Sequence, residues 1–204
     1  MIEKTDQLLS KLFPDKKNKS SDIHIPTSEE LVKLHLLDVE LQKQMQQTKT
    51  TSILEHILTY ASQKGYLLHG SYADIPQIDP RLELLDCNVP KEKQIAVVNA
   101  TSCPAIALFW ATINKNKLIK EYGRKGMIVY DADEKRFSVS PEVFNTRSDG
   151  YVYIVPNDHF FEVKKAEYKF QSYNSVQPVA KIPVVKDVDF KYQLGIIFPK
   201  LRKR

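Results

Sequence analysis

Residues 66–71 of the chain read Tyr-Leu-Leu-His-Gly-Ser. The aromatic and apolar beginning of this stretch is typical of a short buried strand, and its His69-Gly70-Ser71 end is typical of a following turn. Gly70 has no Cβ, so another molecule can approach its backbone closely. The His69 ring can donate or accept a hydrogen bond near neutral pH. We interpret this strand end as a candidate ligand-binding edge, with an incidental histidine in a turn as the alternative.

Before this strand the hydrophobic pattern is helical. Gly65 stands where a glycine usually ends a helix, and Thr27-Ser28-Glu29-Glu30 has the sequence of a capping box that would begin an earlier one. Apolar residues recur at helical spacing in three segments, namely residues 8–13, 31–41 and 51–61. We therefore expect a helical N-terminal region.

After Gly65 most of the pattern is that of short strands. One helix interrupts it, from Ser102 to Ile113, in which we expect Phe109 and Trp110 to pack the core. The predicted strands cover residues 66–68, 95–98, 127–130, 136–139, 151–155, 160–164, 167–172, 179–185 and 196–198. Because helices and strands are segregated rather than alternating, the sequence predicts an α+β fold.

Composition and charge narrow the class of protein. With 204 residues and 42% hydrophobic residues, the chain can bury a core, and it contains neither a run long enough to cross a bilayer nor a signal peptide. Cys87 and Cys103 are too few for a disulfide framework, which favours a reducing compartment. This compartment would be the cytoplasm, or one into which the protein is delivered as an effector. The net charge of +5 is concentrated in residues 16–19, 115–117 and 200–204, runs typical of solvated loops and ends.

Several common kinds of site are absent from the sequence. It has no dinucleotide-binding G-x-G-x-x-G motif, no phosphate-binding G-x-x-x-x-G-K-[ST] loop, no H-E-x-x-H helix and no G-x-S-x-G elbow. The five histidines stand far apart, and none pairs with a cysteine or carboxylate at metal-site spacing. We expect neither a tightly held metal nor a Walker-type nucleotide pocket.

Three groups of short motifs follow one another along the chain: residues 67–71 with 78–81, the strand, turn and helix at 97–111, and residues 150–156 with 167–168 and 175–178. In this order they resemble the ADP-ribosyltransferase fold, in the branch shared by poly-ADP-ribose polymerases and diphtheria-type toxins. The resemblance implies a mainly antiparallel split-sheet domain. It divides the chain into a helical N-terminal region (1–65), an ADP-ribosyltransferase-like domain (66–198) and a basic tail (199–204).

The resemblance also implies a substrate and a reaction. The substrate would be NAD, and ADP-ribose would pass to a protein, nucleic-acid or small-molecule acceptor as nicotinamide leaves. His69 would bond ribose or adenosine hydroxyls, the Gly70 backbone would hold the nicotinamide carboxamide, and Ser71 would add a hydrogen bond to it. Arg81 would pair with the pyrophosphate.

The aromatic ring and the acid that this family uses stay open alternatives. The position of the stacking tyrosine falls on Val98 or Asn99, and Tyr72 is a candidate substitute. The acid is Glu167 in one alignment, whereas a shift of two residues puts Lys169 there, on the same face of a strand. A lysine beside a developing cation would oppose the reaction.

These alternatives give three functional hypotheses. The first is an NAD-dependent transferase, with His69 and Glu167 as catalytic residues and Gly70, Ser71, Tyr72, Arg81 and Asn99 binding NAD. The second is a catalytically degenerate module that binds NAD, ADP-ribose or a protein partner. The third, a relative of RNA 2′-phosphotransferases, would explain the basic balance, but the arginines follow no recognisable pattern. The sequence predicts no membrane partner and leaves the oligomeric state open.

Overall fold

The computed structural model of the protein describes residues 51–82, 95–123, 128–131, 136–163, 168–187 and 193–196. Several sequence predictions lie outside these residues: the helices expected within residues 1–50, Cys87, Glu167 and the basic tail.

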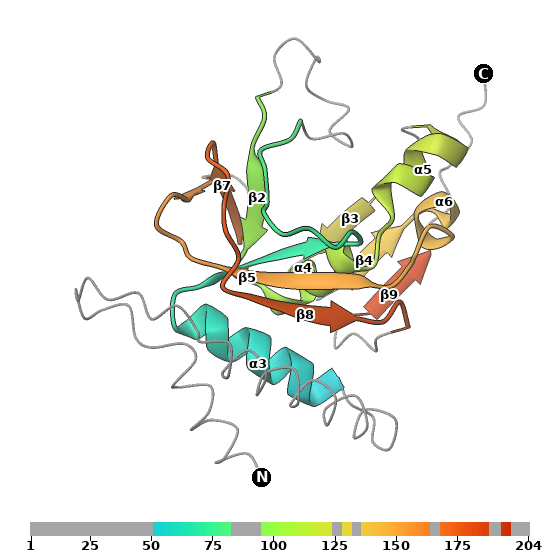
Figure 1. The fold of residues 1–204 in the computed structure, drawn as a ribbon. Coiled ribbons are helices and arrows are strands. Elements are labelled where there is room, and N and C mark those ends of the chain that lie inside the picture. Colours follow the sequence, from blue (N-terminus) through green and yellow to red (C-terminus); the bar gives the residue numbers. More distant parts are fainter. Residues whose placement is uncertain are drawn as a thin grey trace.

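The described chain is mixed α and β and is built around a six-stranded antiparallel sheet (Figure 1). The strand order is β6-β7-β2-β1-β5-β8. These strands are β1 (Leu67–Ser71), β2 (Val98–Thr101), β5 (Gly150–Val155), β6 (Phe161–Glu162), β7 (Lys169–Ser172) and β8 (Ala180–Val184). The prediction of a mixed fold with a mainly antiparallel sheet is confirmed.

A second sheet has three strands in the order β3-β4-β9. They are β3 (Ile128–Asp131), β4 (Arg136–Val139) and β9 (Gln193–Ile196), and β4 pairs with β9 in parallel. The described helices are α3 (Thr51–Gln63), α4 (Pro104–Ala111), α5 (Lys115–Tyr122) and α6 (Pro141–Phe144).

Helix α3 ends as its sequence predicts. Gly65 has a φ of +85°, a backbone conformation that glycine adopts easily, and the amide of Tyr66 donates to the carbonyl of Ala61. Leu54, Leu58 and Ala61 of this helix pack in one core cluster with residues of β1, α4 and β5. Figure 1 shows α3 running alongside β8. The helix therefore contributes directly to the core of the described sheet.

Helix α4 lies between the two sheets. Pro104 occupies its first turn, where the missing N–H costs little, and its other residues are apolar. One side packs on β1 and β5, and the other packs on β4, where the Phe109 and Phe137 rings stack 4.3 Å apart. The burial predicted for Phe109 is confirmed. Trp110 is partly buried against the same cluster.

Two glycines let α4 approach the large sheet closely. A Cβ on Gly70 would lie 2.6 Å from the backbone nitrogen of Ala111, and one on Gly150 would collide with the carbonyl oxygen of the same residue. No side chain fits at such separations, so these two strand positions admit only glycine while the helix stays in place. The packing of α4 thus depends on the His-Gly-Ser stretch.

Helices α5 and α6 are missing from the sequence prediction, and the start of β2 differs from it. The basic run at 115–117 forms the first turn of α5, which the Asn114 side chain caps by accepting from the Lys117 amide at 2.9 Å. Leu118 alone is buried in this helix, so the apolar pattern is weak. Strand β2 covers Val98–Thr101 rather than the predicted residues 95–98, and Ile95 is 65% exposed. Strand β7 begins at Lys169 rather than at residue 167, because Tyr168 lies in a turn.

The opposite face of the large sheet is covered by the segment that follows β1. Tyr153 of β5 fixes this segment, because its hydroxyl accepts from the Ile75 amide at 2.8 Å and donates to the Ala73 carbonyl at 3.0 Å. Burial is the main reason that the pKa of Tyr153 rises to about 12. This hydroxyl therefore stays protonated and holds the turn in place.

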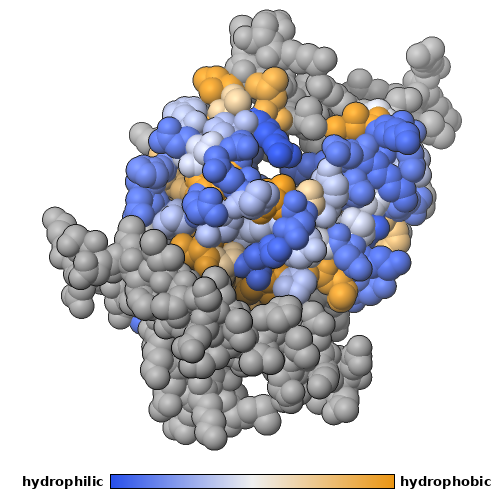
Figure 2. All heavy atoms as spheres, in the orientation of Figure 1, coloured by the Kyte–Doolittle hydropathy of each residue, from blue (hydrophilic) through white to orange (hydrophobic). Residues whose placement is uncertain are grey.

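No helix among the described residues is long and apolar enough to cross a bilayer. Figure 2 shows that the described part of one face is mostly hydrophilic, with small hydrophobic areas scattered through it. Isolated apolar groups of this kind are normal on a protein surface.

Candidate functional site

The large sheet is partly open between β1 and β2. Strand β1 pairs with β5 along its whole length, from Leu67↔Val155 to Ser71↔Tyr151. It pairs with β2 only at Leu68↔Thr101. Beyond that pair the two strands diverge, so His69 and Gly70 face Asn99 and Ala100 across an opening rather than across a ladder of backbone hydrogen bonds.

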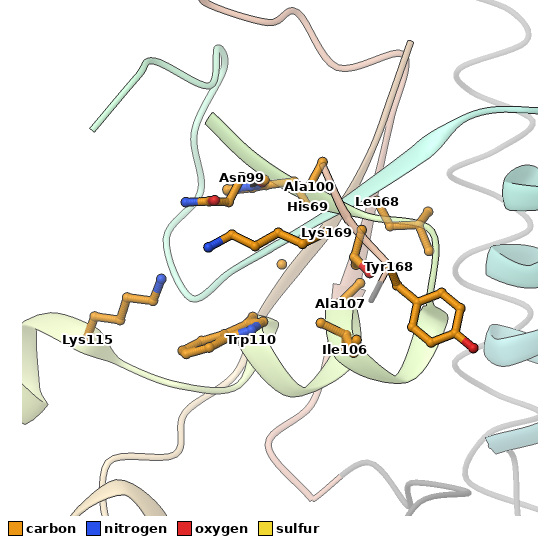
Figure 3. Close-up of a pocket in the computed structure, with 12 residues that line it drawn as sticks. Leu68, His69, Asn99, Ala100, Ile106, Ala107, Trp110, Lys115, Tyr168 and Lys169 are labelled. Atoms are coloured by element: carbon orange, nitrogen blue, oxygen red, sulfur yellow. Dashed lines mark hydrogen bonds between the residues drawn. The ribbon is translucent and has the colours of Figure 1, made fainter. Parts of the chain in front are cut away.

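A pocket of about 240 Å³ lies at this opening (Figure 3). Its residues come from both strands, from one side of α4, from the start of α5 and from the start of β7. They are Leu68, His69, Gly70, Asn99, Ala100, Thr101, Ile106, Ala107, Trp110, Lys115, Tyr168 and Lys169. The volume is somewhat below the roughly 300–1,000 Å³ of sites for whole small molecules, so it suits one end of an extended ligand.

The His69 ring bridges the opening. Its Nδ1 lies 2.6 Å from the backbone oxygen of Asn99. A carbonyl oxygen can only accept, so the neutral ring carries its proton on Nδ1 and a lone pair on Nε2. The side chain thus replaces a ladder hydrogen bond that the diverging strands do not make, and it keeps Nε2 as an acceptor.

The electrostatic surroundings keep this ring neutral. Burial lowers the pKa of His69 to about 4, and the positive charges of Lys115 and Arg81 act in the same direction, while the Asn99 carbonyl opposes them. At neutral pH the ring is uncharged. It can accept a hydrogen bond from a ligand hydroxyl through Nε2, but it does not supply a cation.

Gly70 has a structural role and also lines the pocket. Its missing side chain makes room for the α4 backbone, as the Ala107 carbonyl oxygen occupies the space where a Cβ would lie. We predicted a close approach by a ligand, and the close approach in the structure is by the protein's own helix. Gly70 also lines the pocket, so a ligand contact with its backbone stays a prediction.

Asn99 is held in place from both sides. Its side-chain oxygen accepts from Gln171 on the neighbouring strand β7 at 3.0 Å, and its backbone oxygen bonds His69. Since Oδ1 is the acceptor in this pair, the Asn99 amide nitrogen is oriented as a donor. Val98, the other position considered for an aromatic ring, is buried in the core.

The pocket also contains Trp110 and Lys115, which the sequence does not single out as site residues, and Lys169, which the sequence offers only as the alternative to Glu167. Trp110 of α4 presents a partly buried indole, and Lys115 places its Nζ 4.5 Å from the centre of that ring. Lys169 pairs with Thr101 and lines the pocket from β7. The sequence predicts Trp110 to pack the core and Lys115 to lie in a solvated loop. The only signal in the sequence was the open choice between Glu167 and Lys169.

Tyr168, which precedes Lys169, has a φ of +60°, in the left-handed region that residues other than glycine rarely adopt. Its carbonyl accepts from the Ser102 amide at 3.3 Å, which ties the start of β7 to the turn between β2 and α4. Thr101 contributes to the same corner, because its hydroxyl oxygen accepts from the Cys103 amide at 3.0 Å. Lys169 therefore enters the pocket from a fixed turn.

Three of the predicted site residues, His69, Gly70 and Asn99, meet in the pocket, and three others do not line it. Ser71 accepts from the Ala73 amide at 3.2 Å within the turn after β1. Tyr72 follows it in the same turn, and Arg81 forms an isolated bridge with Val97. Arg81 still lies close enough to lower the pKa of His69. The role of Glu167 stays a prediction, outside the described residues.

Among the described residues, no three His, Cys, Asp or Glu side chains gather in a way that would hold a metal ion. Comparison of the chain with protein-family models, with curated proteins and with solved structures gives no significant match.

Proposed function

We propose that the protein is an ADP-ribosyltransferase-like module that binds one end of NAD or ADP-ribose in the pocket between β1, β2 and α4. The observation that carries the proposal is the meeting of His69, Gly70 and Asn99 at one opening of the sheet. These are residues to which the resemblance assigns NAD binding. The divergence of β1 from β2 also agrees with the split sheet that the resemblance implies.

The chemistry of the pocket favours binding over transfer. Cleavage of the nicotinamide bond builds positive charge on the ribose, and an enzyme must stabilise that charge in the transition state. Lys115 and Lys169 line the pocket, and none of the twelve lining residues that the structure describes is a carboxylate, with Glu167 outside the described residues. Two ammonium groups beside a developing cation raise its energy. We therefore put the catalytically degenerate module first and the active transferase second.

The test uses the intrinsic fluorescence of Trp110, the only tryptophan in the chain. NAD and ADP-ribose are titrated separately into the full chain, and nicotinamide release is followed in parallel with transfer of a labelled adenylate. We expect a saturable change in emission with no release of nicotinamide. His69→Ala should weaken binding about tenfold or more, since it removes the Nε2 acceptor and the bond to Asn99.

His159→Ala is the matched control, because His159 is exposed and does not line the pocket. No saturable response to either ligand, or equal weakening by both histidine variants, would remove the proposal. Nicotinamide release that Glu167→Gln abolishes would establish the active transferase in place of the binding module.

A further inference from the structure

Two lysines from separate elements bring positive charge to the same pocket. Lys115 is the first residue of α5, and Lys169 is the first residue of β7. Figure 3 shows both side chains extending their amino ends toward the same end of the pocket, with the Trp110 indole beside them. Both residues are partly buried rather than fully exposed.

A contact with Trp110 positions the Lys115 ammonium group, whereas strand pairing positions the Lys169 backbone. The Lys115 ammonium lies over the Trp110 ring at 4.5 Å from its centre, a cation–π arrangement. Lys169 follows the turn at Tyr168 and lies opposite Thr101 in the ladder between β2 and β7. An ammonium group held over an aromatic ring, as that of Lys115 is, loses less conformational freedom on binding a ligand than a lysine on a mobile loop does.

The described residues that line the pocket include two lysines and no acidic side chain. Arg81 adds a third positive charge nearby, which together with Lys115 disfavours protonation of His69. The nicotinamide ring of NAD carries a positive charge itself. A phosphate group is negatively charged, and ammonium groups bind it through short charge-assisted hydrogen bonds.

We propose that this end of the pocket, between Lys115 and Lys169 and beside Trp110, is a phosphate site, and that the preferred ligand is a nucleotide that places a phosphate there rather than a cationic ring. This inference rests on the proposed binding of an adenine nucleotide and narrows its ligand class. It also predicts an order of affinity: AMP binds more tightly than adenosine, and NADH, with its uncharged ring, binds more tightly than NAD.

The experiment compares ligands and variants by the emission of Trp110. Adenosine, AMP and inorganic pyrophosphate are titrated into the full chain, and pyrophosphate is tested as a competitor of ADP-ribose. We expect pyrophosphate to bind saturably and to compete. Lys115→Gln and Lys169→Gln should each weaken AMP binding about tenfold, and Lys169→Arg should preserve it. NADH and NAD are compared through their competition with ADP-ribose.

Lys120→Gln is the control, since Lys120 lies exposed on α5, carries the same charge and does not line the pocket. If all three Lys→Gln variants weaken AMP equally, only net charge matters and the phosphate site is refuted. Equal binding of adenosine and AMP refutes it too. Failure of pyrophosphate to compete with ADP-ribose is a third refutation.

The two proposals fail in different ways. If Lys115→Gln and Lys169→Gln leave the binding of NAD and ADP-ribose unchanged, the phosphate site is overturned and the proposed function stands. Saturable pyrophosphate binding without any response to NAD or ADP-ribose overturns the proposed function and leaves a phosphate site of another ligand class.

Discussion

Substitution of Gly70 by alanine would test how closely α4 packs on β1. A Cβ at this position would lie 2.6 Å from the backbone nitrogen of Ala111 and 3.0 Å from the carbonyl carbon of Trp110. It would lie closer still to the carbonyl oxygen of Ala107. Ordinary contacts between such atoms are about 3.5–4 Å, so the helix backbone must move by at least about 1 Å to admit one methyl group, and the Ala107 carbonyl by more.

The cost follows from what has to move. Overfilling a packed core costs about 1–3 kcal/mol, and here the backbone of a buried helix yields rather than the end of a flexible side chain. We expect the free energy of unfolding of Gly70→Ala to fall by about 3 kcal/mol. For a chain of this length that corresponds to a fall in Tm of about 6–12 °C. Urea and thermal denaturation followed by circular dichroism measure both quantities.

Gly123→Ala is the control, because Gly123 has a φ of +67° and a Cβ there would meet nothing within 4 Å. It should cost only the strain of a side chain in this glycine-specific backbone conformation (φ +67°, ψ −138°), about 1–3 kcal/mol, and leave the emission of Trp110 unchanged. Gly70→Ala should change that emission, because the atoms that it displaces include the Trp110 backbone. A Gly70→Ala protein with wild-type stability and wild-type emission would refute the packing described for α4.

Three further predictions concern His69, Tyr153 and an exposed ion pair. The pKa of His69 is about 4 when folded and about 6.5 when unfolded, so unfolding takes up a proton between these values and stability falls as pH decreases. Between pH 6.5 and pH 4, urea denaturation should show a loss about 3 kcal/mol larger in the wild type than in His69→Gln, and equal pH dependence would contradict this. Tyr153→Phe leaves the Ile75 amide without its bond to the hydroxyl and should lower the free energy of unfolding by about 1–3 kcal/mol; a loss below about 0.5 kcal/mol would disagree. Lys181→Ala should change stability by at most about 1 kcal/mol in the same assay, since both Lys181 and its partner Asp74 are exposed.

The parts of the fold that the sequence predicts are those determined by local patterns. The end of α3 at Gly65, the bounds of β4 and the burial of Phe109 all follow from spacing and residue type. Helix α5 could not be predicted in this way, because it buries only Leu118 and its first turn is rich in lysine. Its cap by Asn114 is visible in the sequence only once the helix is known.

The candidate site depends on tertiary structure to a greater degree. Phe109 and Trp110 are neighbours on a helix that is apolar on all sides. Helical periodicity shows that their side chains point in different directions, but it does not show which of the two faces the pocket. The strand that the sequence predicts over residues 167–172 would put Glu167 and Lys169 on one face by alternation, so the sequence cannot choose between them. In the structure β7 begins at Lys169, and its pairing with β2 puts Lys169 opposite Thr101 at the pocket. The opening itself is a property of two strands that diverge after one pair.

The structural and ligand-binding interpretations of the His-Gly stretch are not alternatives. Gly70 allows α4 to lie against β1, and this position brings Trp110 to the opening of the sheet. The opening removes β1 backbone as a partner for Asn99, and His69 supplies the missing hydrogen bond through Nδ1. That bond puts the ring proton on Nδ1. The interaction that links the two strands therefore leaves Nε2 as an acceptor. The packing that stabilises this corner therefore also leaves an unprotonated ring nitrogen on a residue that lines the pocket.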